Sequence, residues 1–183
     1  MHGFKEARGG FKEARGDMTN DLWRYSTETN QWLKLETQQK ASPSIRSGHA
    51  MTAVGLELYV WGGRHQSESG NPYPDDLWRY STVTNQWLQL KTAALGASPS
   101  GRINHAMTAV GSDLYLVGGT IELETTNTSR ATVFDDVWRY STVTNQWMQV
   151  ESGAAAGRAF VWLCSKQGLS KESGSLASHC THF

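Results

Sequence analysis

The sequence predicts an all-β fold in which small four-stranded sheets stack face to face around an axis. The main observation is a twelve-residue segment, Asp-Leu-Trp-Arg-Tyr-Ser-Thr-x-Thr-Asn-Gln-Trp, that occurs at 21–32, 76–87 and 136–147 with only its second and eighth positions varying. A second stretch, Arg-x-x-His-Ala-Met-Thr-Ala-Val, occurs at 46–54 and 102–110. The repeats sustain no helical hydrophobic period. A long-period repeat of this kind predicts units that bury their apolar faces only by stacking on their neighbours.

The chain opens with a duplicated heptapeptide, Gly-Phe-Lys-Glu-Ala-Arg-Gly, at 3–9 and 10–16. One large apolar residue in each copy is too few for a coiled coil, and adjacent glycines disfavour a helix. We therefore expect residues 1–20 to be a disordered leader. The alternative function for this segment is a basic-aromatic docking peptide.

The repeat units follow the leader, with four short strands in each complete unit. Residues 21–36 supply only the last two strands of a first unit, and residues 46–91 and 102–150 form two complete units. In the unit 46–91, β-branched and aromatic residues between Gly and Asn breaks predict strands. Those strands are expected at 49–54, 57–61, 77–81 and 86–91.

A further unit begins at 155–163 and then fails, because Val161 stands where the two complete units have His49 and His105. The chain therefore holds about two and a half four-stranded sheets. It is either a fragment or truncated product, or one partner in an assembly of several chains. The end faces of such a stack are apolar, which favours association.

The expected strands are apolar on both faces, as two-sided burial requires. We expect the repeated aromatic residues to form the core between sheets, and the paired glycines to allow a sharp exit from the second strand. A ligand platform made by the Trp-Arg-Tyr triplet is the alternative. The motif residues are Trp23, Tyr25, Trp32, Tyr59, Gly62, Gly63, Trp78, Tyr80, Trp87, Tyr115, Gly118, Gly119, Trp138, Tyr140 and Trp147.

These residues resemble the kelch repeat. Tyr59-Val-Trp-Gly62-Gly63, its second copy from Tyr115 to Gly119, and the three Tyr-Ser-Thr-x-Thr-Asn-Gln-Trp hairpins match the kelch pattern in order and spacing. The chain has Ser-Thr where the family usually has Asp-Pro. The resemblance covers residues 21–158 and implies a kelch-type β-propeller fragment. Kelch blades mostly serve as platforms for protein interactions. The resemblance therefore implies a fold and a general binding role, and it implies no specific reaction.

Composition excludes several classes of function. The 17 basic and 17 acidic residues give a formal net charge of zero, which does not favour nucleic acid or anionic membrane as a partner. No apolar run reaches the length of a membrane span, and the N-terminus does not read as a signal peptide. We therefore expect a cytoplasmic protein.

The tail 164–183 is rich in Ser, Gly and Lys, and we expect it to be mobile. It contains both cysteines, Cys164 and Cys180, with His179 and His182 beside the second. This cluster lacks the ligand spacing of a structural zinc site. We expect no metal and no cofactor, although a disulfide between the cysteines is compatible with an oxidising compartment.

Two groups of residues are candidates for binding. Arg46 and Arg102, each three residues before a His, open the innermost strands by kelch analogy. One interpretation is that His49 and His105 hold a metal in the propeller channel. The other is that each His makes hydrogen bonds within its blade and each Arg faces a loop carboxylate. The second group lies in two connections that differ in sequence and length while the scaffold repeats, as a recognition surface requires. These connections, 64–75 and 120–135, contribute Arg64, His65, Tyr73, Glu122, Glu124 and Arg130. The alternative is that both are solvated loops without a binding role.

The leading hypothesis for function is a non-enzymatic scaffold that binds a protein partner through these two connections and self-associates through open blade faces. No nucleophile with a local base and no phosphate-binding glycine loop is visible. The alternatives are a fragment of a kelch-propeller enzyme, such as a metal-dependent oxidase or lyase, and an inactive truncated paralogue. The repeats contain no Cys, which weighs against a copper-radical oxidase with a Cys–Tyr crosslink.

Overall fold

A computed structural model describes residues 19–36, 41–65, 71–91, 97–125 and 128–151. These residues form twelve strands and no helix, so the predicted all-β fold is confirmed. Accordingly, the described part of the chain holds no helix that would be long and apolar enough to cross a membrane. The predicted leader, the failed unit at 155–163, and the tail with its two cysteines lie outside the described residues, apart from residues 19 and 20.

The strands form two four-stranded antiparallel sheets and two two-stranded hairpins. The first hairpin contains β1 (Leu22–Ser26) and β2 (Gln31–Leu35). The first full sheet has the order β3-β4-β5-β6, with strands Ala50–Val54, Glu57–Trp61, Leu77–Ser81 and Gln86–Leu90. The second full sheet has the order β7-β8-β11-β12, with strands Ala106–Val110, Asp113–Val117, Val137–Ser141 and Gln146–Glu151. The second hairpin contains β9 (Thr120–Thr125) and β10 (Thr128–Val133).

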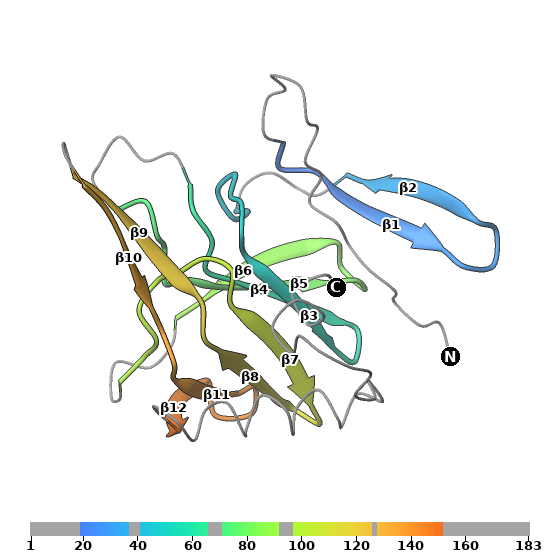
Figure 1. Ribbon diagram of the computed structural model, residues 1–183. Helices are drawn as coiled ribbons and strands as arrows, with labels where there is room; N and C mark the ends of the chain where they lie inside the picture. Colours follow the sequence, from blue (N-terminus) through green and yellow to red (C-terminus); the bar gives the residue numbers. More distant parts are fainter. Residues whose placement is uncertain (1–18, 37–40, 66–70, 92–96, 126–127, 152–183) are drawn as a thin grey trace, which may run out of the picture.

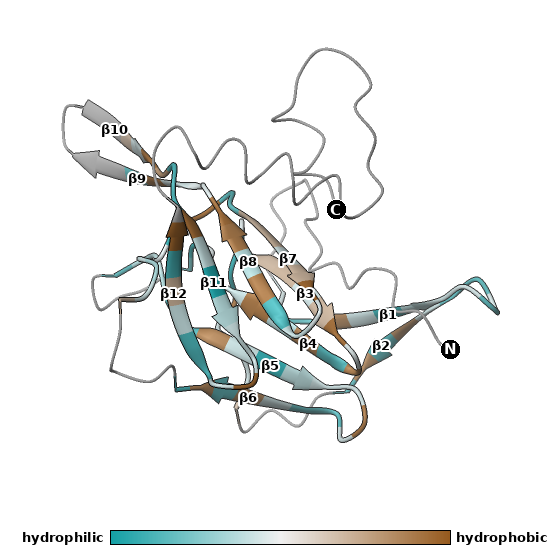
Figure 2. Ribbon diagram, turned by 90° about the horizontal axis from the view of Figure 1, so that it is seen from below, coloured by the Kyte–Doolittle hydropathy of each residue, from teal (hydrophilic) through white to brown (hydrophobic). Residues whose placement is uncertain are grey.

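The two full sheets are neighbouring blades of a partial β-propeller. Figure 1 shows their first strands, β3 and β7, side by side. Figure 2 shows hydrophobic segments of β3, β7 and β8 meeting between the blades. The buried residues of this interface come from both sheets, and they are Tyr59, Trp61, Leu77, Leu114, Leu116, Trp138, Tyr140 and Trp147. Because each sheet buries an apolar face against the next one, its strands are apolar without strict alternation.

The β1–β2 hairpin packs on the opposite face of the first blade. Leu22 joins Leu58 and Tyr80 in a second, smaller core cluster. The exposure of the repeated tryptophans shows that this hairpin lies at the end of the described stack. Trp78 and Trp138 are 8% and 6% exposed, whereas the equivalent Trp23 is 36% exposed. Trp23 differs because no described strand covers the outer face or the outer edge of its hairpin.

The twelve-residue repeat builds the same hairpin three times. The tyrosine hydroxyl donates to the side-chain oxygen of the turn asparagine at 2.9, 2.8 and 2.9 Å, and the three pairs are Tyr25–Asn30, Tyr80–Asn85 and Tyr140–Asn145. The asparagines have φ of 55°, 56° and 56°, a left-handed conformation that Asn tolerates better than most residues. Each tyrosine ring also lies 5.1–5.2 Å from the tryptophan ring opposite it on the next strand. The repeat therefore encodes a turn and its cross-strand support.

The paired glycines are required by backbone conformation and by close packing. Gly62 and Gly63 have φ of 67° and 98°, and Gly118 and Gly119 have 63° and 99°. A Cβ at Gly62 would lie 2.8 Å from Cε1 of His105 and 2.9 Å from the carbonyl oxygen of Arg102. Gly62 thus lets the second blade approach the first.

Candidate functional site

The first connection, between β4 and β5, has internal hydrogen bonds that fix its shape. The His65 amide donates to the Pro72 carbonyl at 2.9 Å, and His65 Nε2 lies 3.1 Å from the Asn71 carbonyl oxygen. The Tyr73 amide donates to Asn71 Oδ1 at 3.0 Å. These bonds join the two ends of the connection, so its described residues form an ordered surface.

Tyr73 joins the first connection to the second. Its ring is buried, and its hydroxyl donates to the Glu122 carbonyl at 2.8 Å while it accepts from the Glu122 amide at 3.0 Å. The Arg64 guanidinium also lies 3.6 Å from the Glu122 carboxylate. The two connections therefore contact each other directly, and we call their described residues the loop face.

The second connection is not a loop over most of its length. Its strands β9 and β10 pair with each other and extend away from the two blades (Figures 1 and 2). Thr, Ile and Val in this segment favour strands, and no neighbouring blade is needed for two strands to pair with each other. Glu124 lies on β9 and Arg130 on β10, where they face Ser129 and Leu123 in the register, but their side chains fall outside the described set.

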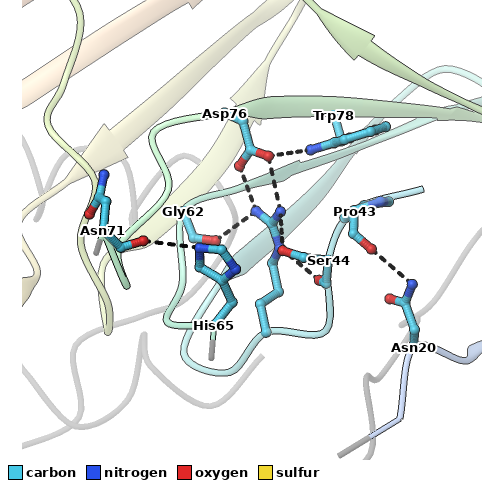
Figure 3. A network of polar contacts seen from close by, with 9 residues as sticks. Asn20, Pro43, Ser44, Gly62, His65, Asn71, Asp76 and Trp78 are labelled. Atoms are coloured by element: carbon cyan, nitrogen blue, oxygen red, sulfur yellow. Dashed lines mark hydrogen bonds and ion pairs between the residues drawn. The ribbon is translucent and has the colours of Figure 1, made fainter. Parts of the chain in front are cut away.

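Arg46 occupies a buried network within the first blade (Figure 3). Its guanidinium donates to both carboxylate oxygens of Asp76, at 2.7 and 3.0 Å, and to the Gly62 carbonyl at 3.0 Å. Trp78 Nε1 donates to the same carboxylate at 2.5 Å. Burial alone raises the pKa of Asp76, but the hydrogen bonds and charge of Arg46 outweigh it, so the pKa lies below its usual value.

Arg102 repeats this network in the second blade. It donates to both oxygens of Asp136 and, at 3.0 Å, to the Gly118 carbonyl, while Trp138 Nε1 donates to Asp136 at 2.7 Å. The guanidinium also lies 3.7 Å from the centroid of the Phe134 ring, a cation–π geometry. As at Asp76, burial raises the pKa of Asp136, and the bonds from Arg102 and Trp138 lower it further than burial raises it.

These contacts give Arg46 and Arg102 a structural role. Their side chains are 4% and 1% exposed, and their donors are directed at blade atoms. Sequence reasoning placed both residues in a binding group and left the carboxylate partner unnamed. A signal was present: Asp76 and Asp136 open the same repeat in the two units that contain such an arginine.

His49 and His105 lie beside the junction of the blades. His105 is buried, packs edge-on against Trp61 at 4.9 Å between ring centroids, and has no hydrogen-bond partner of good geometry for either ring nitrogen. Burial, reinforced by the charge of Arg102, lowers the pKa of His105 to about 3, and burial lowers that of His49 as well. Among the described residues, no three His, Cys, Asp or Glu side chains gather as a metal site would require. His105 is therefore a neutral packing residue in this structure.

Comparison with known proteins agrees with this architecture. A family model described as the KLHDC2/KLHL20/DRC7 Kelch-repeats domain matches residues 8–166. Tip elongation aberrant protein 1 of Schizosaccharomyces pombe is 37% identical over 75% of this chain, and human Kelch domain-containing protein 3 is 28% identical over 78%. A Thlaspi arvense protein named N-(sulfonatooxy)prop-2-enimidothioate sulfolyase is 29% identical over 61%. The matches cover only 12%, 36% and 31% of these relatives' own lengths. With two complete blades, paired glycines and the Tyr–Asn turn in place, the chain belongs to the kelch-repeat family.

Proposed function

We propose that this chain is a protein-binding scaffold whose contact surface is the loop face. The observation that supports this most is the pair of hydrogen bonds between Tyr73 and Glu122, because it joins two unlike connections into one surface. A preformed surface loses less conformational entropy when it binds than two separate loops would. The repeated hairpins supply the rigid support that a recognition surface needs.

The exposed groups of the loop face carry charges of both signs. The side chains of Arg64 and Glu122 are 42% and 51% exposed, and Asp75 and Asp135, which belong to the same two connections, are exposed as well. Mixed charge of this kind suits specific recognition of a folded protein more than attraction to a polyanion. The proposed partner is therefore a protein with complementary charges, and the proposed compartment is the cytoplasm.

The test is a binding measurement with a partner that has been captured by the wild-type chain, identified and purified. Replacement of 64–75 and 120–135 by Gly-Ser should abolish binding, and Arg64→Ser with Asp75→Ser should weaken it. A matched control is Val83→Ser with Val143→Ser, since both valines are exposed at turns beyond the opposite ends of β5 and β11. Full binding by the loop replacement would reject the loop face as the contact surface.

The relative named as a sulfolyase favours a second candidate, a fragment of a lyase. That reading predicts stoichiometric metal in the purified protein and turnover of a substrate of the lyase class. Metal analysis by mass spectrometry decides it at low cost. Copper or iron bound at one ion per chain would favour an enzyme over a scaffold.

Self-association through open blade faces stays a prediction. The support for it is the exposure of Trp32, which is 51% exposed. The equivalent Trp147, which packs between two blades, is 7% exposed. Sedimentation velocity over a hundredfold concentration range measures it directly. A constant sedimentation coefficient at the monomer value would reject it.

A further inference from the structure

The β9–β10 hairpin, which projects from the blades (Figure 2), has different backbone contacts along its two outer edges. In an antiparallel pair, the amide and carbonyl of one residue either both face the partner strand or both face away from it, and the two cases alternate along the strand. The Thr120 amide and carbonyl both bond to Ile103, and those of Glu122 both bond to the Tyr73 hydroxyl. The outward groups of β9 at these two residues are therefore satisfied.

The outward groups of β10 have no such partners. Ala131 and Val133 lie opposite Glu122 and Thr120 in the register, so their amides and carbonyls also face away from the strand opposite. In the part of the chain that the structure describes, β10 pairs with β9 alone, and no backbone group bonds to Ala131 or Val133 at this edge. A strand edge of this kind presents donors and acceptors at the spacing that an added strand requires.

The side chains beside this edge define what an added strand must carry. Val133 is apolar and 71% exposed, so a second apolar side chain can cover it. Ala131 is exposed and small, and it shares its face of the hairpin with Glu122, the residue opposite it. A residue that pairs with Ala131 from the outside lies two strand spacings, about 9–10 Å, from Glu122. A lysine or arginine at that position can extend over Ala131 to the carboxylate.

The charge of the loop face favours a basic occupant. The exposed charged side chains that the structure describes there are one base and three acids, Arg64, Asp75, Glu122 and Asp135. Glu124 and Arg130 add one charge of each sign and leave this acidic excess unchanged. A basic segment is therefore attracted to the surface, whereas a second copy of the chain brings the same acidic excess with it.

We propose that the free edge of β10 docks an extended basic segment of the partner protein as a third, antiparallel strand. This inference rests on the proposed function and names the form in which the partner is bound. A lysine or arginine of the segment pairs with Ala131 and reaches Glu122, and an apolar residue two positions before it covers Val133. Tyr73 fixes the other edge of the hairpin to the first connection, so the new strand is added to a support that is already ordered.

The probe is a synthetic peptide, Gly-Ser-Val-Thr-Lys-Thr-Thr-Ser-Gly, in which valine precedes lysine by two positions. Titration into the full chain, followed by nuclear magnetic resonance of the backbone amides, should show saturable shifts of Ala131 and Val133 and none in β11. A peptide with valine two positions after lysine should bind severalfold more weakly, because it matches only a parallel strand. No saturable shift of the two amides at the highest soluble peptide concentration would overturn the proposal.

Exchange of charges tests the contact with Glu122. Replacement of the peptide lysine by glutamate should weaken binding to the wild-type chain about fivefold, the amount expected for loss of a partly exposed ion pair. The Glu122→Lys chain should recover that loss and should bind the lysine peptide less well than the wild type does. This substitution keeps the Glu122 backbone, which makes the bonds to Tyr73. Equal binding of both peptides by both chains would refute the charge match.

Proline tests strand addition, because it removes an amide. Ala131→Pro deletes an outward donor that β9 does not use, so it should abolish peptide binding while the hairpin stays paired. Exchange protection of the Ile121 and Thr132 amides verifies the pairing. Val133→Ser should weaken binding without altering the backbone, and Val143→Ser is the matched control, since this valine is 76% exposed at a turn of the second blade. Unchanged binding by Ala131→Pro and Val133→Ser would overturn the proposal.

Other occupants of the edge have distinct signatures. Ala131 and Val133 amides that exchange as slowly as those of β11 in the free chain would show that another part of this chain covers the edge. A wild-type dimer that becomes monomeric on Ala131→Pro substitution would show that a second copy covers it. If Arg64→Ser with Asp75→Ser weakens binding of the captured partner and Ala131→Pro does not, the edge is not the contact but the loop face still is. Full partner binding after replacement of both connections would reject the loop face itself.

Discussion

Substitution of Gly62 by alanine should destabilise the protein through the contact between blades, and Gly118 offers a matched comparison. Both glycines precede a second glycine at the end of the second strand, and their φ values of 67° and 63° are nearly the same. The backbone cost of alanine in this conformation, about 1–2 kcal/mol, is therefore common to the two variants. What differs is the space around the added Cβ.

At Gly62 the added methyl group would lie 2.8 Å from His105 Cε1 and 2.9 Å from the Arg102 carbonyl oxygen. At Gly118 the nearest described atom is the Phe134 carbonyl oxygen at 3.4 Å, an ordinary contact. Overpacking of a close contact costs about 1–3 kcal/mol. Gly62→Ala should therefore lower the free energy of unfolding by about 1–3 kcal/mol more than Gly118→Ala does.

Urea denaturation followed by tryptophan fluorescence measures both free energies. A double variant, Gly62→Ala with His105→Ala, should recover part of the difference because it removes one of the two clashing groups. Equal destabilisation by Gly62→Ala and Gly118→Ala would refute the reasoning, since it would mean that blade packing places no demand on the glycine. No recovery in the double variant would assign the clash to the Arg102 backbone alone.

Three further predictions follow from the networks around the blades. Arg102→Met leaves the Asp136 carboxylate without its buried partner and should lower the free energy of unfolding by about 3 kcal/mol in the same urea assay. Tyr73→Phe removes the hydroxyl that binds the Glu122 backbone, so the Glu122 amide should exchange faster with deuterium while the blade amides keep their protection. The pKa of His105 is about 3 in the folded chain and about 6.5 when unfolded, so the unfolded state binds the extra proton between these values. Stability should therefore fall by about 1.4 kcal/mol per pH unit below 6.5, and His105→Gln should reduce that slope between pH 6.5 and 4.5.

The strands could be predicted closely because their signals are local and repeated. The middle two strands of the first blade occupy 57–61 and 77–81 as expected, and the outer two begin or end one residue inside the predicted limits of 49–54 and 86–91. Asn marks one of these boundaries: Asn85, at the turn between the last two strands of the first blade, has a left-handed φ of 56°. Such local turn and strand signals can be identified in one repeat unit and compared with the same positions of the next unit.

The β9–β10 hairpin escaped prediction because its signal occurs only once. Its segment differs from the first connection in length and composition, which made it resemble a solvated loop. The link from Tyr73 to Glu122 spans 49 residues and depends on backbone groups, which carry no mark in the sequence. Neither the hairpin nor this contact recurs in another unit, so comparison of the repeats does not reveal them.

The contacts between units explain why these blades need neighbours. Arg46 donates to the Gly62 carbonyl within the first blade, and the next residue, Gly63, donates its amide to the Arg102 carbonyl of the second blade at 2.9 Å. Arg102 in turn donates to the Gly118 carbonyl. In both complete blades an arginine thus binds the paired glycines of its own unit, and the glycines of the first blade bind the second blade.

This linkage leaves a distinct deficit at each end of the described stack. At the first hairpin, Asp21 pairs with Lys34 of the same hairpin instead of a buried arginine, and among the described residues no carboxylate pairs with Arg24 as Glu57 pairs with Arg79. At the last blade, Gly118 has the backbone of a glycine built for close approach, but no described neighbour fills the space beside it. The two deficits differ in kind, because the ion pairs of Arg79 and Asp76 lie within one blade, whereas the contact of Gly62 lies between two blades.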